Sequence, residues 1–557
     1  MSEYIRLKEA NCKNCYKCIR HCPVKSISFS QNQAQIISDA CILCGECFIV
    51  CPQDAKIIRD DTDRAKALLA AGAPVWASVA PSFAAAFPGV GIESMEAALQ
   101  KLGFDGAEET AIGATLVKKE YEDMIREGEQ AVIISSCCPS VNLLIRRHYP
   151  ETLPYLAPVI SPLEAHCRDL KHRYPDAKTV FIGPCISKKF EADEEGSSID
   201  CVLTFEDLAA WLERSGIQFE PEARNNTDTG RARIFPTAGG ILKSMYCNSK
   251  EYSYLTVDGT ENCKAALRDI ASGQLGNCFI EMSACTGSCT GGPAAGKTRL
   301  APLKSALAVA GYAGETDFPV EARAGALRRD FSALPRDERL PSEPELRQIL
   351  LEMGKKTPEY ELNCGSCGYD TCREKAIAIY QGKADLTMCL PFLRDKAETF
   401  SSNILKNSPN GILVLDDELR VQQINPAALR MLNISAASDV VGDAVVRILD
   451  PALFIDARDT GSLHESRTYL AEYNKYVEET VVFDKTYHLL LCILRDVTDE
   501  ELTRQQKEKI SAKTIEIADN VIDKQMRVVQ EIASLLGETT AETKVALTKL
   551  KESLEDE

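Results

Sequence analysis

The chain has 557 residues, of which 45% are hydrophobic and 26% charged, so global disorder and a collagen-like structure are excluded. Its 82 acidic residues outnumber 64 basic ones and give a net charge of -18, which argues against a nucleic-acid-binding surface. The length predicts about four folded units. The 23 cysteines, with no apolar stretch at the start of the sequence, predict a cytoplasmic protein whose thiolates bind metal.

The first 60 residues contain one cysteine pattern twice, each time as C-x2-C-x2-C-x3-C-P. In this pattern three cysteines of one copy share a 4Fe–4S cluster with the last cysteine of the other copy. The first set is then Cys12, Cys15, Cys18 and Cys51. The second set is Cys41, Cys44, Cys47 and Cys22. Two zinc sites are the alternative, but they would show ligands in pairs. The segment resembles a bacterial two-cluster ferredoxin, which implies one-electron transfer.

Residues 68–87 form the longest weakly polar run, and Pro74 and Pro81 interrupt it, so it predicts a buried strand with loops and no membrane span. Further cysteines then follow three apolar, strand-like runs, in the motifs SSCCPSV, GPCISKKFE and EMSACTGSCTGG. Loops at the carboxyl ends of strands are where an α/β fold places its sites. We therefore expect these three loops to meet.

The three loops resemble the signature loops of the iron-only (FeFe) hydrogenases, and residues 74–351 resemble the H-cluster domain of that family. The resemblance implies a 4Fe–4S cubane joined to a diiron subsite with CO, cyanide and azadithiolate ligands. The implied cubane ligands are Cys138, Cys185, Cys285 and Cys289, the last of which would bridge to the diiron subsite.

The same resemblance implies roles for residues around the cluster. Cys137 would transfer protons, and Lys188 would hydrogen-bond a cyanide ligand. Three further residues would line the pocket: Pro81, Ser82 and Phe235. Two positions depart from the family, since Gly183 and Ser283 stand where it has methionines that pack on the diiron unit.

The proton route beyond the cysteine also departs from the family. Tyr121 and Met124 fall where it has glutamates, and Ala157 falls where it has a serine. Glu120 and Glu122 are the alternative proton carriers on the same helix. Because proton transfer needs hydrogen-bonded neighbours, we expect slow turnover.

A compact motif, C-x2-C-x4-C-x16-C, follows within residues 352–395. It resembles the small 4Fe–4S module of corrinoid iron–sulfur proteins and of some membrane electron-transport subunits, with zinc as the alternative. Its ligands would be Cys364, Cys367, Cys372 and Cys389. We expect this third accessory cluster between the hydrogenase-like domain and the rest of the chain, away from the ferredoxin segment.

Residues 400–498 read strand, turn at Asp416 and Asp417, strand and helix, with a late strand ending in D-x-T. This order resembles a PAS sensor domain. His464 and His488 are isolated, which favours surface or core roles over haem ligation, so no PAS cofactor is expected.

The remaining segment, residues 500–557, is charged and helical. A stripe with heptad-like spacing favours either a dimeric coiled coil or a helix packed on its own chain. The stripe consists of Ile510, Ile517, Val521, Val528, Ile532 and Leu535. Gly537 should end the first helix, and a second should begin near Thr540.

The motifs together predict a multidomain α/β and α+β protein that resembles the sensory, PAS-containing branch of the FeFe hydrogenases. This implies a hydrogen or redox sensor that oxidises H2 slowly and reversibly, with a relay through three accessory 4Fe–4S clusters to the PAS domain. Implied partners are H2 and protons, a ferredoxin or other electron carrier, a phosphatase or kinase, and a second copy of the chain. A working ferredoxin-linked hydrogenase and an iron–sulfur assembly factor without the diiron site are the alternatives. Six cysteines have no assigned role and are expected to be buried or idle: Cys167, Cys201, Cys247, Cys263, Cys278 and Cys492.

Overall fold

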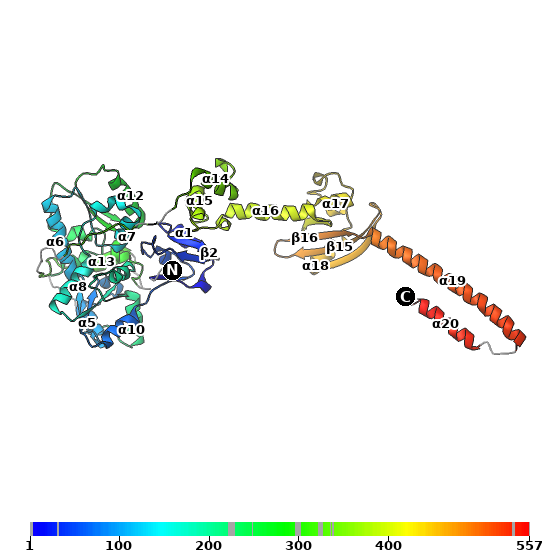
Figure 1. The fold of residues 1–557 in the computed structure, drawn as a ribbon, viewed down its shortest axis with the longest axis horizontal. Coiled ribbons are helices and arrows are strands. Elements are labelled where there is room, and N and C mark those ends of the chain that lie inside the picture. The colour runs from blue at the N-terminus through cyan, green and yellow to red at the C-terminus, as the bar shows by residue number, and fades with distance from the viewer. Residues whose placement is uncertain are drawn as a thin grey trace. The chain divides into compact units, whose positions relative to one another are not determined.

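The computed structural model describes residues 4–30, 33–220, 229–247, 249–295, 302–320, 327–334, 336, 339–536 and 541–555. It divides into two compact units, Met1–Leu393 and Arg394–Glu557, which follow one another along the chain in Figure 1. Among the described helices, none is both long and apolar enough to cross a membrane. The predicted multidomain α/β and α+β class is confirmed.

The N-terminal segment is built from two small antiparallel strand pairs and two short helices, and each short helix follows a three-cysteine loop. Strand β1 pairs with β4, and β2 pairs with β3. The elements are β1 (Ile5–Leu7), α1 (Lys17–Arg20), β2 (Ile27–Ser30), β3 (Gln33–Ile36), α2 (Glu46–Ile49) and β4 (Lys56–Ile58). Ile5, Ile19, Ile27 and Ile42 are buried in its core, which is continuous with that of the next segment.

Two parallel sheets with helices around them form the central part of the first unit. The four-stranded sheet has the order β6-β5-β8-β9, and the three-stranded sheet has the order β10-β11-β7. The strands are β5 (Val75–Val79), β6 (Gly106–Glu109), β7 (Val132–Ile134), β8 (Lys178–Gly183), β9 (Cys201–Thr204), β10 (Ser253–Asp258) and β11 (Cys278–Ser283). Strands β7, β9 and β11 are buried at every residue, as expected for parallel strands covered on both faces.

The helices of this part connect the strands. They are α3 (Thr62–Ala70), α4 (Phe83–Ala86), α5 (Ile92–Lys101), α6 (Ala111–Glu127), α7 (Pro139–His148), α8 (Pro162–Arg173), α9 (Ser187–Asp193), α10 (Phe205–Arg214), α11 (Gly240–Ser244), α12 (Thr260–Ala271) and α13 (Pro302–Tyr312). The three strands expected before the cysteine motifs are present as β7, β8 and β11. The run at 68–87 contains the buried strand β5, as predicted.

The small cysteine module is formed by α14 (Glu343–Glu352), α15 (Cys372–Tyr380) and the loop between them, and α16 (Leu390–Asn407) follows. Its position corrects an expectation, because it packs directly on the ferredoxin-like segment. The Phe29 amide donates to the Lys383 carbonyl at 2.8 Å, and Lys25 Nζ donates to the Gly368 carbonyl at 2.9 Å. Position along the chain had suggested a site away from that segment, but close packing between the two loops decides otherwise.

The second unit contains one antiparallel sheet with the order β13-β12-β16-β15-β14, which agrees with the predicted strand and helix order. Its elements are β12 (Gly411–Asp416), β13 (Val421–Ile424), α17 (Pro426–Met431), α18 (Ala452–Thr460), β14 (His464–Leu470), β15 (Lys475–Asp484) and β16 (Leu489–Asp496). His488 lies in an exposed turn, and His464 is hydrogen-bonded to Thr460 Oγ1 at 2.8 Å.

Two C-terminal helices follow, α19 (Thr498–Leu536) and α20 (Ala541–Glu555). They contact each other through Lys551 and Asp519 at 3.1 Å. The apolar stripe is exposed from Ile510 (67%) to Ile532 (48%), so the coiled coil stays a prediction. The Leu535 side chain and Gly537 lie outside the described residues.

Candidate functional site

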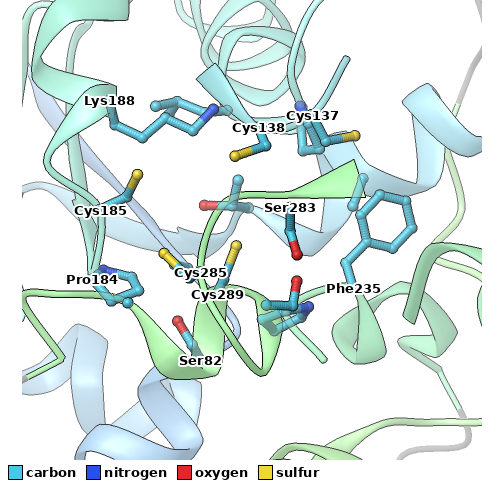
Figure 2. A pocket seen from close by; sticks show the side chains of 18 of the residues that line it. Ser82, Cys137, Cys138, Pro184, Cys185, Lys188, Phe235, Ser283, Cys285 and Cys289 are labelled. Carbon is cyan, nitrogen blue, oxygen red and sulfur yellow. The ribbon is translucent and has the colours of Figure 1, made fainter. Parts of the chain in front are cut away.

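Four loops meet at the carboxyl ends of strands β5, β8, β7 and β11, the first two from one sheet and the last two from the other. They enclose a cavity of about 120 Å³ (Figure 2). Every residue that the sequence placed at this site lines the cavity: Pro81, Ser82, Cys137, Cys138, Cys185, Lys188, Phe235, Cys285 and Cys289. In Figure 2 the labelled cysteines surround one common space.

Burial dominates the electrostatics of the four cysteines that were expected to hold the cubane. It raises the pKa of Cys285, and the neighbouring thiols of Cys185 and Cys138 raise that pKa further. The same causes, in the same order, raise the pKa of Cys289, where Lys188 opposes them. Four converging thiols in a buried cavity are ligands for a soft metal centre, because only a bound cation lets several thiolates coexist there.

Lys188 supplies the positive charge of the cavity. Its ammonium donates to Glu191 Oε2 at 2.6 Å, and the residue is 8% exposed. Burial lowers the pKa of Lys188, but the carboxylate of Glu191 and the thiols of Cys185 and Cys137 outweigh it and raise the pKa. The side chain therefore stays cationic and suits an anionic ligand in the cavity.

Cys137 is hydrogen-bonded to a tyrosine, where the sequence comparison expected a carboxylate. The Tyr121 hydroxyl lies 3.2 Å from Cys137 Sγ and 3.1 Å from Ser136 Oγ, and it accepts from the Ser136 amide at 3.0 Å. Ser136 Oγ in turn donates to the Val159 carbonyl at 2.6 Å. This network ends on a backbone carbonyl, and Ala157 adds no hydroxyl to it. Burial raises the pKa of Cys137 to about 12, with the Tyr121 bond and Lys188 opposing the rise.

Neither alternative glutamate reaches the thiol. Glu122 Oε1 accepts from the Tyr246 amide at 2.5 Å, and Glu120 is partly exposed near Arg328. The carboxyl that does line the cavity is Glu281, which the sequence analysis missed. The available signal was a single acidic residue inside the apolar strand CFIEMS.

Glu281 is held by backbone amides. Its Oε2 accepts from the amides of Ile241 at 2.9 Å and Leu242 at 3.2 Å. Burial nevertheless raises the pKa of Glu281 to about 7, against these bonds. A carboxyl with such a pKa beside Cys137 is suited to hold or release a proton near neutral pH.

The two methionine positions have a local explanation at Gly183. A Cβ atom on Gly183 would lie 2.5 Å from Phe181 Cζ and 3.1 Å from Ala80 Cβ. Phe181 therefore takes up the room that a longer side chain at position 183 would need, and it lines the cavity itself. Ser283, 8% exposed, also lines the cavity.

Ser82 gives a direct test of fit to a bound group. Its hydroxyl is buried and has no hydrogen-bond partner within the described residues. Such an atom is rare, and a polar ligand in the cavity would satisfy it. The thiols, the Lys188 ammonium and this hydroxyl together fit a cluster that carries anionic ligands.

The structure also brings together the three accessory cysteine sets. The first set lines one cavity: Cys12, Cys15, Cys18 and Cys51. In the second set, Cys47 has its pKa raised by burial and then by three neighbours: Cys41, Cys44 and Cys22. The third set lines another cavity: Cys364, Cys367, Cys372 and Cys389. In the described ranges, no three His, Cys, Asp or Glu side chains could hold a single metal ion.

The six remaining cysteines lie outside these sets. Cys247 is partly exposed, and the other five are buried: Cys167, Cys201, Cys263, Cys278 and Cys492. Cys263 Sγ donates to the Ser283 carbonyl at 3.3 Å, one strand residue away from the cavity loop. This agrees with the expectation of buried or idle thiols.

Comparison with known families supports the domain pattern. Residues 73–293 match the family described as iron only hydrogenase large subunit, C-terminal domain. Residues 4–52 match a 4Fe-4S dicluster domain, 361–391 an Fe-S cluster family, and 399–466 a PAS domain.

Individual relatives are distant. The NADP-reducing hydrogenase subunit HndD of Solidesulfovibrio fructosivorans is 25% identical, over 48% of this chain and 57% of its own length. Iron hydrogenase 1 of Clostridium pasteurianum is 28% identical, over 43% of this chain and 53% of its own length. The chain thus spans about half the length of these relatives. A solved FeFe-hydrogenase structure, HydA(deltaEFG), aligns with a TM-score of 0.40 and 19% identity, over 49% of this chain and 99% of that one.

The chain therefore carries an iron-only hydrogenase large-subunit domain, with a 4Fe-4S dicluster domain before it and a PAS domain after it. This pattern, together with the cysteine motifs, confirms the recognition made from the sequence.

Proposed function

We propose that this chain is a hydrogen-responsive redox sensor, in which the cysteine-lined cavity reacts slowly and reversibly with H2 and the accessory clusters relay the redox state to the PAS domain. The observation that carries the proposal is the pairing of Cys137 with Tyr121 at 3.2 Å in a chain that also matches a PAS domain. A neutral phenol in a closed network moves protons poorly, which favours a readout over high throughput.

Each cavity residue has a proposed part. Four cysteines would hold the cluster: Cys138, Cys185, Cys285 and Cys289. The bound H-cluster would supply the metal centre at which H2 is split into two protons and two electrons. Cys137 would pass a proton, Lys188 would anchor an anionic ligand, and Ser82 would hydrogen-bond the group. Pro81 and Phe235 would exclude water.

Infrared spectroscopy of protein matured with its diiron unit tests the site. We expect CO and cyanide bands, and we expect Cys289→Ala to lose them, because that thiol would bridge to the diiron unit. Cys263→Ala is the matched control, since Cys263 is buried nearby outside the set. Matured wild-type protein without such bands would contradict the site.

A ferredoxin-linked hydrogenase is the second candidate, and the retained Cys137 thiol beside Glu281 favours it. Hydrogen uptake with a viologen dye separates the two. The sensor proposal predicts turnover well below that of metabolic hydrogenases, and turnover at their level would reject it in favour of metabolism.

The output partner is proposed to be a phosphatase or kinase that contacts the PAS domain and the C-terminal helices, with a homodimer through the exposed stripe of α19. The electron carrier would be a ferredoxin or a similar protein. The cytoplasmic location expected from the thiolate content stays a prediction.

A further inference from the structure

The loop of the small cysteine module rests directly on the turn that carries Cys22. Gly368 adopts φ +93°, and a Cβ there would lie 2.9 Å from Ile19 Cγ2 and 3.1 Å from the Arg20 amide nitrogen. Arg20 donates to the Ser366 carbonyl at 3.2 Å, which adds a second contact. Only a glycine allows this approach and this backbone conformation, so the contact is specific to the loop.

Tyr369, the next residue, lies between two cysteine sets. It is 3% exposed and lines the cavity of the module. Burial raises its pKa, and the thiols of Cys367 and Cys22 raise it further, so both sets are close to the ring. Its hydroxyl has no hydrogen-bond partner within the described residues. A buried hydroxyl beside two sulfur sites needs an acceptor, and a cluster sulfur would provide one.

The second ferredoxin set also contacts the cavity loops. Gly45, which follows Cys44, has φ +77°, and a Cβ there would lie 2.5 Å from Pro293 Cβ and 2.9 Å from Ile186 Cδ1. The thiols that raise the pKa of Cys285 include Cys44. Three cysteines from the two sets, Cys22, Cys44 and Cys285, line one groove.

We propose that the second ferredoxin set is a junction, through which an electron from the hydrogenase-type cavity reaches the C-terminal module across Tyr369, and that the Tyr369 hydroxyl donates to a cluster sulfur there. The inference rests on the proposed function only for the presence of the clusters. Oxidation of one H2 releases two protons and two electrons, and each 4Fe–4S cluster accepts one electron. The junction passes its first electron to the module and is then reduced again.

The hydroxyl is tested in full-length chain that carries only the cubanes, without the diiron unit. We expect Tyr369→Phe to shift the midpoint potential of the module or the junction cluster to lower values, because hydrogen bonds to the sulfurs stabilise the reduced state. Tyr360→Phe, an exposed tyrosine of the same module, is the matched control and should cause no shift. Unchanged potentials in Tyr369→Phe would overturn the role of Tyr369.

The junction is tested by electron paramagnetic resonance of the same reduced chain. We expect a magnetic interaction between the module cluster and the second ferredoxin cluster. It should weaken in Gly368→Ala, which separates the loops, and stay in Gly382→Ala, where a Cβ meets no atom within 4 Å. An interaction that is lost in Cys15→Ala but survives in Cys44→Ala would overturn the junction, because it would come from the first set.

Hydrogen then tests the route in matured protein. Cys44→Ala should keep the infrared bands of the diiron unit but lose reduction of the module by H2. Reduction at the wild-type rate would overturn the route. If H2 fails to reduce any cluster in wild-type protein, the proposed function fails, while the magnetic measurement still decides the junction.

Discussion

At the scale of single residues, the cavity differs from the expected pattern where side chains from separate elements meet. Tyr121 comes from α6 and Cys137 from the loop after β7, so their contact is set by how helix and strand pack. Glu281 points from β11 to the amides at the start of α11. Both residues are visible in the sequence, but their partners lie too far along the chain to be inferred from spacing.

Replacing Tyr121 by phenylalanine removes one hydroxyl from a closed network. The Ser136 amide then lacks its acceptor, so its opening free energy should fall by about 1–3 kcal/mol, the range for a buried polar group left unpaired. Hydrogen exchange at the Ser136 amide measures this. Tyr246→Phe, at a tyrosine that is 57% exposed, should leave that exchange unchanged. Equal protection in both variants would mean that the hydroxyl contributes nothing.

Glu281 should control the pH dependence of hydrogen uptake. Because burial raises its pKa to about 7, its proton is held below that pH and released above it. We expect a step near neutral pH in the viologen assay of matured protein, and we expect Glu281→Gln to remove the step. Glu122→Gln changes another buried carboxyl that accepts from a backbone amide, but one outside the cavity, so the step should remain. A step that persists without Glu281 would assign it to another group.

At the scale of elements, glycines with positive φ allow loops from separate segments to touch. Gly45 joins the second ferredoxin loop to the cavity loops, and Gly368 joins the module to α1. The short helices α1 and α2 each begin after a residue in the left-handed region, Tyr16 and Gly45. Cysteine spacing predicted these loops, whereas their contacts with one another depend on the tertiary packing.

Gly45→Ala should destabilise the first unit through both backbone strain and a clash with Pro293 at 2.5 Å. We expect a loss of about 2–4 kcal/mol, the sum of a left-handed penalty and overpacking. Gly72→Ala is the control, since its φ of +82° carries the strain without any atom within 4 Å. Denaturant unfolding measures both variants, and similar losses would show that the contact with Pro293 adds nothing.

Strand β15 carries a buried carboxyl in the PAS sheet. Glu479 is 7% exposed, its Oε1 has no partner within the described residues, and burial raises its pKa to about 7. The folded domain therefore holds this proton more tightly than the unfolded chain, whose glutamates titrate near pH 4.3. Its stability is greatest below that pH and falls as the pH rises towards 7.

We expect Glu479→Gln to remove this fall and to stabilise the second unit at pH 8 by on the order of 2 kcal/mol relative to wild type. Thermal unfolding at pH 5 and pH 8 measures the effect. Glu465→Gln, on the exposed face of β14, should keep the wild-type pH dependence. A wild-type stability that does not change between the two pH values would contradict the prediction.

At the scale of the whole molecule, the chain combines a cavity for hydrogen chemistry with a domain that matches PAS sensors. Hydrogen–deuterium exchange of residues 411–496 tests whether the two communicate. In matured protein we expect the exchange to differ between H2 and an inert gas. Cys364→Ala should abolish the difference, because it removes a proposed ligand of the module. Cys247→Ala changes a cysteine outside every set and should preserve the difference. A response that survives in Cys364→Ala would place the relay elsewhere.

The sequence by itself determined the four cysteine sets and the order of the domains, because a tight loop delivers several thiolates at short spacing and strand periodicity is local. It also indicated the strands β5, β7, β8 and β11, whose loops carry the site. Only the tertiary structure decided that Tyr121 pairs with Cys137, that Glu281 lines the cavity and that the module packs on the ferredoxin-like segment. Those contacts join residues far apart in the chain, where close packing rather than local pattern selects the neighbours.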